Sequence, residues 1–207
     1  MCQSSLFPEG EVNASLSQWY THPGLAERMV RWAFVLPEWC RAVRRVLEPS
    51  AGVGNIIWPI LDHDRQVEVE AWEIDEKNCQ AMLQRNPRRT TIHHENFLNA
   101  DLGNERFDLA VMNPPFENDQ DVQFIMKAAS HCDRVVSIVR GVLRHGQNRW
   151  SCFWRYIDIV REVVLIERPK FGGAYNPMQD FLIVEFKLAK VPRNRGQATT
   201  GHSIEWW

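Results

Sequence analysis

The 207-residue sequence has few features of secreted, membrane-spanning or disulfide-bonded proteins. No apolar run approaches the length that crosses a membrane, and the opening residues MCQSSLFPEG have neither a basic region nor an apolar stretch. The five cysteines are scattered, and no pair has the Cys-x-x-Cys spacing of a zinc site. These absences predict a soluble globular protein of a reducing compartment, most simply the cytoplasm.

Two motifs that bind phosphates or metals are also incomplete. The segment Leu47–Asn55, LEPSAGVGN, lacks the full Gly-x-Gly-x-x-Gly pattern and the Lys-Ser/Thr of a phosphate-binding loop. His93 and His94 are adjacent, so on a strand they would face opposite ways, and no acidic partner is spaced for coordination. We therefore predict no metal site.

The net charge of −2 conceals an asymmetry along the chain. Residues 1–133 carry 12 Lys+Arg and 20 Asp+Glu, a net of −8, whereas residues 134–207 carry 12 and 6, a net of +6. A basic C-terminal half suits contact with the phosphates of a nucleic acid. A solvated protein surface explains the same charge equally well.

Short apolar runs alternate with helical patterns through most of the chain. Strands are predicted at 45–48, 67–73, 90–94, 107–112, 134–139, 163–167 and 181–186, and helices at 24–34, 53–61, 76–86, 121–129 and 149–160. This alternation predicts a seven-stranded, mostly parallel α/β sheet with helices on both faces. The last two strands lack a long connecting helix, which predicts an antiparallel pair. Residues 191–207 read as a loosely ordered tail.

The Gly-bearing turn after the first strand suggests a ligand site. Gly52 and Gly54 let backbone approach a ligand closely. Glu48, at the end of the strand, would repel a polyphosphate but suits a ligand with a cationic end, such as an amino acid. A tight turn without ligand would have the same residues.

An acidic residue follows at the end of the next strand. Glu73 comes about twenty residues after the glycines, where a carboxylate accepts hydrogen bonds from both hydroxyls of a ribose. Asp75 is placed to cap the following helix. The turn and the acid together indicate a nucleoside-bearing ligand without identifying it.

The segment Asn113-Pro114-Pro115-Phe116 follows the apolar strand predicted at 107–112. Two prolines fix the backbone and remove two donors, so that carbonyl oxygens and the Asn113 amide form a cluster of acceptors. Such a cluster binds an NH2 group and draws its lone pair out of conjugation with a ring. Phe116 offers a face for stacking a planar base that has left the duplex.

With these three motifs in order, residues 20–187 resemble the amino-methyltransferases of DNA and RNA, especially the adenine-N6 DNA methyltransferases. The resemblance implies a class I Rossmann-like methyltransferase domain at 1–190, with an N-terminal extension at 1–19 and a tail at 191–207. It also implies S-adenosyl-L-methionine as cofactor and Asn113, Pro114, Pro115 and Phe116 as catalytic residues. Transfer would be a direct displacement without a covalent enzyme intermediate, and the motif has no cysteine for a cytosine C5 mechanism.

The resemblance extends to the cofactor site. Tyr20-Thr21-His22-Pro23 is similar to the family's N-terminal Thr-Pro-Pro segment, and Glu95-Asn96-Phe97-Leu98 to its Asp-Phe-Leu segment. Asn96 replaces the usual aspartate, and its carbonyl oxygen still allows a contact with the cofactor's adenine amine. The cofactor-binding residues implied are Tyr20, Thr21, Pro23, Glu48, Pro49, Ser50, Ala51, Gly52, Gly54, Asn55, Glu73, Ile74, Asn96, Phe97 and Asn113.

The resemblance does not extend to a separate domain for recognising the acceptor. Relatives that read a DNA sequence usually carry a recognition domain, whereas about twenty residues follow the last predicted strand, so we expect low or short sequence specificity. Contacts with the nucleic acid are predicted for Arg140, Arg144, Arg149, Phe171 and Tyr175.

Three alternatives to DNA adenine methylation stay open. The first is adenine-N6 methylation of RNA, such as ribosomal RNA, which uses the same motif. Protein glutamine N5 methylation usually has Tyr after the prolines, and the basic C-terminal half argues against it. A non-catalytic cofactor-binding subunit would have little reason to keep Asn113, Pro114 and Glu73.

Overall fold

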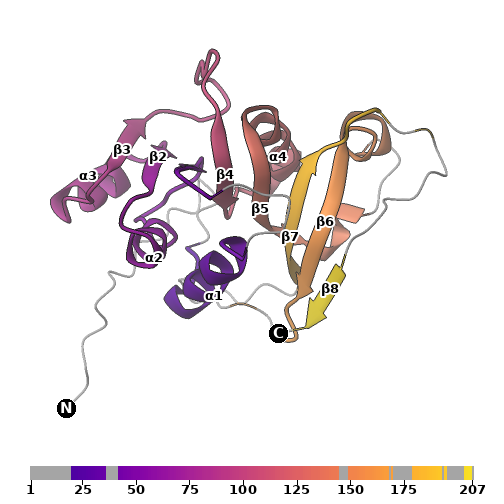
Figure 1. The fold of residues 1–207 in the computed structure, drawn as a ribbon, viewed down its shortest axis with the longest axis horizontal. Helices are drawn as coiled ribbons and strands as arrows, with labels where there is room; N and C mark the ends of the chain where they lie inside the picture. The colour runs from indigo at the N-terminus through magenta and orange to yellow at the C-terminus, as the bar shows by residue number, and fades with distance from the viewer. Residues whose placement is uncertain are drawn as a thin grey trace.

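An eight-stranded sheet forms the centre of the protein in a computed structural model (Figure 1). The structure describes residues 20–35, 42–144, 149–167, 169, 179–192, 194 and 203–206. Phe171 and Tyr175, together with the proposed extension at 1–19, lie outside the described residues.

The strands follow the order β3-β2-β1-β4-β5-β7-β6-β8 across the sheet. Neighbouring strands are parallel except that β7 runs antiparallel to both β5 and β6. The predicted mostly parallel α/β sheet and its antiparallel final hairpin are therefore confirmed. The bounds are β1 Arg45–Glu48, β2 Glu68–Glu73, β3 Thr90–His94, β4 Phe107–Met112, β5 Cys132–Arg140, β6 Ile157–Val164, β7 Phe181–Leu188 and β8 Ser203–Trp206.

Strand β8 lies within the segment that the sequence suggested was a loosely ordered tail. It pairs parallel to β6, with Arg161 opposite Ser203 and Val164 opposite Trp206. The Nε1 of Trp32 donates a hydrogen bond to Oε1 of Glu205 at 2.8 Å. Part of the tail therefore extends the sheet beyond the seven strands expected.

The central strands are buried on both faces, because successive side chains enter different hydrophobic clusters. Val46, Leu109 and Val136 join one cluster, which also contains Met29, Val30, Ile57, Ile60 and Met82 from helices. The neighbouring residues Leu47, Ala110 and Val135 join the other, with Ile125 and Ala128 of helix α4 (Gln120–His131). Helices therefore cover both faces, as the alternation of strand and helix patterns predicted.

Helix α1 (Pro23–Ala33), α2 (Ile57–His63) and α3 (Glu76–Gln84) each contribute to the first cluster, and α4 (Gln120–His131) to the second. Short helical turns complete the described chain at η2 (Glu117–Asp119), η3 (Gly141–Arg144) and η4 (Trp150–Trp154), the last with π-helical bonding. No helix of the described residues is long and apolar enough to span a membrane.

The helix predicted at 149–160 is wrong. Only the turn η4 is helical there, and β6 begins at Ile157, earlier than the strand predicted at 163–167. The four-residue spacing of Trp150 and Trp154 is compatible with a helix. The β-branched run Ile157-Asp158-Ile159-Val160 instead alternates between buried and half-buried positions and pairs with β7.

Candidate active site

A cavity of about 310 Å³ opens at the carboxyl ends of the parallel strands β1 to β4. In parallel sheets this edge, near the point where strand order reverses, is where ligands bind. Thirteen residues that the sequence analysis placed in the site line the cavity: Tyr20, Thr21, Pro49, Ser50, Ala51, Gly52, Asn55, Glu73, Ile74, Asn96, Phe97, Asn113 and Pro115. Five others do not line it: Pro23, Glu48, Gly54, Pro114 and Phe116.

The turn after β1 brings backbone to the cavity wall. Gly52 and Gly54 have φ of 56° and 86°, in the left-handed region that favours glycine. A Cβ at Gly52 would lie 3.1 Å from the Tyr20 ring, so a side chain there would be both strained and crowded. Ala51 donates its N–H to the Trp72 carbonyl at 2.9 Å, which fastens the turn to β2.

Glu73 ends β2 beside this turn and is buried, with 7% of its surface exposed. Its Oε2 accepts the Gly52 N–H at 2.6 Å, and its Oε1 accepts the Asp75 N–H at 2.8 Å. Burial raises the pKa of Glu73, against the opposing effect of these hydrogen bonds. The carboxylate is thus held by backbone at the cavity, with lone pairs still able to accept from a diol.

Glu48 ends β1 and lies behind the cavity wall, fully buried. Its Oε1 accepts from the Ser50 N–H at 3.1 Å and from the Ser50 hydroxyl at 3.3 Å, while Oε2 has no hydrogen-bond partner. Burial raises the pKa of Glu48 to about 8. In this structure the group therefore supports the turn and does not line the cavity, whereas its neighbours Pro49 and Ser50 do.

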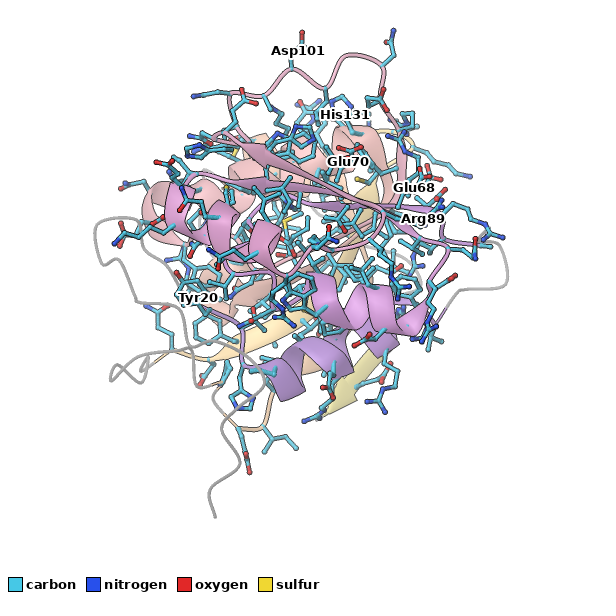
Figure 2. The ribbon with its side chains drawn as sticks, turned by 90° about the vertical axis from the view of Figure 1, so that its left-hand side faces the viewer. Tyr20, Glu68, Glu70, Arg89, Asp101 and His131 are labelled. Carbon is cyan, nitrogen blue, oxygen red and sulfur yellow. The ribbon has the colours of Figure 1, made fainter. Side chains whose placement is uncertain are left out.

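The segment Tyr20–Thr21 covers the turn from the other side. The Tyr20 hydroxyl donates to Oδ1 of Asn78 at 3.1 Å, and Nδ2 of Asn55 donates to the Thr21 carbonyl at 2.9 Å. Helix α1 starts directly afterwards, with Pro23 as its first residue and His22 accepting the Gly24 N–H on its ring. Tyr20 is labelled in Figure 2, on the left of the view.

Asn113 follows β4 and is buried at the cavity wall, with 9% exposed. Its Nδ2 donates to Oγ1 of Thr21 at 3.1 Å, and its backbone carbonyl accepts the Ser50 hydroxyl at 3.1 Å. Three segments that are distant in sequence meet at this residue. Its amide is therefore oriented by the same segments that enclose the cavity.

Phe116 takes a different position from the one its motif suggested. It is 6% exposed, its ring centroid lies 5.4 Å from that of Phe181, and the Arg140 guanidinium lies 5.6 Å from the ring centroid. The face predicted to stack on a base is thus covered in this structure. Beyond it, Asn118 and Asp119 have φ of 51° and 56°, and Asn118 lines the cavity.

Two of the arginines predicted to bind a nucleic acid form ion pairs with aspartates that follow Phe116 in the sequence. Arg140 contacts Oδ2 of Asp121 at 3.2 Å, and Arg149 contacts Oδ1 of Asp119 at 2.5 Å. Arg149 also donates to the Val142 carbonyl. Arg144 lies in η3, and its side chain is outside the described part of the structure.

Seven residues that line the cavity were not predicted from the sequence as site residues: Ile56, Trp72, Glu95, Glu117, Asn118, Gln120 and Phe124. Trp72 and Phe124 looked like ordinary core residues of a strand and a helix. The ring centroids of Trp72 and Phe124 lie 5.7 and 5.5 Å from that of Phe97. This proximity depends on how β2, β3 and α4 pack together. The polar residues 117–120 directly follow the Asn-Pro-Pro-Phe motif, which was the available signal.

His93 and His94 contact residues of β2 and of the turn that follows it. His93 Nε2 contacts Oε2 of Glu70 at 2.6 Å, and its ring stacks on Trp72 at 4.1 Å. His94 Nε2 contacts the Ile74 carbonyl at 3.1 Å. Among the residues that the structure describes, no group of three His, Cys, Asp or Glu side chains is arranged to hold a metal.

Residues 34–135 match the methyltransferase small domain family. The matched segment is an S-adenosylmethionine-dependent methyltransferase domain. It contains the turn after β1, Glu73 and Asn113, and its cofactor is S-adenosyl-L-methionine. No curated protein sequence matches the chain.

Solved structures share the class I Rossmann-like fold of this methyltransferase. A Pyrococcus horikoshii protein provisionally described as an RNA methyltransferase has a TM-score of 0.68 at 19% identity, over 89% of this chain and 93% of its own. A 23S rRNA methyltransferase has a TM-score of 0.60 at 17% identity, over 86% and 73%. A dimethyladenosine transferase from Plasmodium falciparum has a TM-score of 0.56 at 14% identity, over 84% and 64%.

Proposed function

We propose that this methyltransferase transfers the methyl group of S-adenosylmethionine to the exocyclic N6 amine of adenine in DNA. The observation that carries the proposal is the position of Asn113 at the cavity wall after β4, with its amide oriented by Thr21. Because Nδ2 donates to Thr21, Oδ1 is the atom that would accept a hydrogen of the acceptor amine. An exocyclic amine is a group that such an acceptor recognises.

The cavity residues fit the cofactor by chemistry. Glu73 would accept from the ribose hydroxyls, Asn96 and Phe97 would hold the adenine, and the segment Tyr20–Thr21 would enclose the methionine end. The bound cofactor supplies an electrophilic methyl group on sulfur. Placing it against an oriented amine removes much of the entropic barrier, and no strong base is needed, since the nitrogen loses its proton readily once methylated.

Asn113 would act by polarisation, whereas Pro114 does not line the cavity. A hydrogen bond from the acceptor NH2 to Oδ1 of Asn113 would concentrate electron density on the nitrogen as it attacks. Such fixed dipoles act where charge develops and need no rearrangement during the reaction. Phe116 would stack on the base only after its ring is uncovered from Phe181, so the acceptor base would have to open this contact.

RNA is the second candidate acceptor. It is favoured by the likeness to a 23S rRNA methyltransferase and to the Pyrococcus horikoshii protein, which this chain matches over most of their lengths. DNA is preferred because the sequence resembles adenine-N6 DNA methyltransferases from Tyr20 to the Asn-Pro-Pro-Phe motif. Both acceptors present the same amine to Asn113.

The deciding experiment supplies the protein with labelled S-adenosylmethionine and separate pools of DNA, RNA and protein. Nucleoside analysis should find N6-methyl-2′-deoxyadenosine. Sequencing of the treated DNA should map the methyl groups to adenines in many different flanking sequences. Label in RNA alone would move the proposal to the second candidate, and a long, strictly defined DNA site would refute low specificity.

The control for this assay is Asn113→Ala. The residue is proposed to contact the acceptor amine, so the variant should lose methyl transfer by at least about a hundred-fold. Its affinity for the demethylated cofactor should stay within a few-fold of the wild type. Turnover within a few-fold of the wild type would mean that the motif has a structural role only.

A further inference from the structure

A lysine outside the predicted site joins the helix after the catalytic motif to the loop after β3. Lys127 lies on α4, and its Nζ donates to the carbonyls of Phe97, Leu98 and Ala100 at 2.6, 3.1 and 2.5 Å. All three ammonium hydrogens are used by these contacts. The ammonium also lies 4.9 Å from the centre of the Phe97 ring.

The loop that Lys127 holds forms part of the cavity wall. Asn96 and Phe97 line the cavity, and Phe97 is buried between the rings of Trp72 and Phe124. The Asn96 side chain accepts the Leu98 N–H at 2.9 Å and thereby closes a tight turn. Figure 2 shows Asp101 at the outer end of the connection between β3 and β4, just beyond this turn.

Convergence of three carbonyls on one point is unfavourable without a cation, because their dipoles repel. The ammonium removes that repulsion, so the loop conformation depends on its presence. Burial lowers the pKa of Lys127, while Glu95 and Asp101 raise it and favour the charged form. The contact therefore holds a charged lysine against carbonyls beside the cavity.

We propose that Lys127 is a positioning residue that sets the place of Phe97 and Asn96 for the adenine of the cofactor. The proposal rests on the placement of adenine beside these two residues in the proposed function. Since α4 begins at Gln120, four residues after Phe116, the lysine also fixes the adenine side of the cavity relative to the acceptor side. Lys127 itself does not line the cavity.

The test measures binding of S-adenosylhomocysteine and of adenosine by calorimetry, in the absence of any acceptor. Lys127→Met keeps much of the chain length and removes the three donors. We expect both ligands to bind about ten-fold or more weakly, by similar factors, and Lys127→Arg to recover much of the loss. The matched control is Lys190→Met, an exposed lysine after β7, which should bind both ligands as the wild type does.

Kinetics separates positioning from general loss of structure. Lys127→Met should raise KM for S-adenosylmethionine while kcat at saturating cofactor stays within about three-fold of the wild type. Unchanged affinity for both ligands, or a lower kcat with unchanged KM, would overturn the proposal. If Lys127→Met does not fold, Lys127→Gln replaces it, because glutamine keeps a donor without the charge. The expected and contradicting results are then the same as for Lys127→Met.

A second variant distinguishes failure of this inference from failure of its premise. Phe97→Leu should weaken adenosine binding if adenine lies beside that ring. Weakening by Phe97→Leu alone would reject only the role of Lys127, whereas no effect from either variant would reject the adenine placement. Neither result depends on whether the acceptor is DNA or RNA.

Discussion

Two buried carboxyl groups end neighbouring parallel strands, and their surroundings give them different tasks. Glu73 receives backbone N–H groups on both oxygens and lines the cavity, so it is prepared to accept further hydrogen bonds. Glu48 lies behind the wall, and one of its oxygens has no hydrogen-bond partner. The environment of each carboxyl group, and not its residue type, decides whether it lines the cavity or supports the turn.

The role of Glu73 is tested by Glu73→Ala. Loss of a charged hydrogen-bond acceptor costs roughly 1.5–3 kcal/mol, so the affinity for S-adenosylhomocysteine should fall by about ten-fold or more. Calorimetry measures this, and Glu73→Gln should lie between the wild type and the alanine variant. The control is Glu70→Gln on the same strand, whose carboxylate contacts His93 and does not line the cavity. Wild-type affinity in folded Glu73→Ala would reject the ribose contact.

Glu48 should make folding stability depend on pH. Its pKa is raised from 4.5 to about 8 in the folded protein, so the folded state binds a proton that the unfolded state has released between these values. The stability contribution is therefore fully present below about pH 4.5 and is lost as pH rises to about 8. Glu48→Gln removes the titration and keeps an acceptor for Ser50.

This change is measured by denaturant unfolding at several pH values. Relative to the wild type, Glu48→Gln should gain stability steadily from pH 5 to pH 8, by roughly 3–5 kcal/mol at most across the full interval. Above pH 8 the difference should level off. A difference that does not change with pH would mean that Glu48 titrates near its ordinary value in the folded protein.

At the scale of elements, strand ends could be predicted from sequence but helix contacts could not. The strands at 45–48, 90–94 and 107–112 have the predicted bounds, because their apolar or β-branched residues are bounded by charged residues, Asn or Pro. Asn113 directly follows the last of these strands, and Glu73 ends β2, whose end was also predicted. Asn78 and Lys127 act through the approach of α3 and α4 to distant loops, and nothing in the local sequence specifies that approach.

A buried ionic cluster connects α1 to the antiparallel end of the sheet. Glu185 of β7 contacts Arg134 at 2.7 Å and Arg161 at 2.6 Å, and the side chains of Glu185 and Arg134 are fully buried. The same arginines donate to carbonyls at the end of α1: Arg134 to Ala33, and Arg161 to Trp32 and Val35. The C-terminal end of the helix that follows Thr21 is thereby fixed to β5 and β6.

Glu185→Gln should destabilise the protein strongly, because it removes the buried carboxylate that both arginines contact. Breaking one partner of a buried pair costs about 3–5 kcal/mol, which denaturant unfolding would detect as a lower midpoint. The control is Glu68→Gln, which removes the exposed pair with Arg89, labelled in Figure 2, and should cost less than about 1 kcal/mol. Equal effects from the two variants would mean that the cluster contributes no more than a surface pair.

At the scale of the whole molecule, the charge asymmetry is partly neutralised inside the fold. Arg140 and Arg149 are paired with aspartates of the acidic half, and Arg134 and Arg161 are paired with Glu185 of their own half in a largely buried cluster. The net of +6 in residues 134–207 therefore overstates the positive charge at the surface. Sequence counts could not reveal this, since the pairs form between segments 19 to 51 residues apart.

Of these four arginines, Arg149 is the one best placed to exchange its partner for a phosphate. Its pair with Asp119 lies in the segment after the Asn-Pro-Pro-Phe motif, and the Asp119 side chain is 58% exposed whereas that of Arg149 is 18% exposed. An ion pair with one partner mainly in solvent contributes little stability, about 1 kcal/mol, whereas a phosphate accepts two hydrogen bonds from a guanidinium. We expect Arg149 to leave Asp119 when DNA binds.

The salt dependence of DNA binding tests this exchange. The binding constant falls as salt rises, and each phosphate contact makes the slope of log K against log salt concentration steeper by about 0.9. Arg149→Gln should therefore make this negative slope shallower by about one. Any counterion that binds the freed Asp119 would reduce this difference. Fluorescence anisotropy with a short duplex at a series of salt concentrations measures the slope. Arg89→Gln is the matched control, because Arg89 is also paired at the surface but lies beside β3, at the far edge of the sheet from β5. Equal slopes in Arg149→Gln and the wild type would mean that the arginine stays on Asp119 and holds the segment in place.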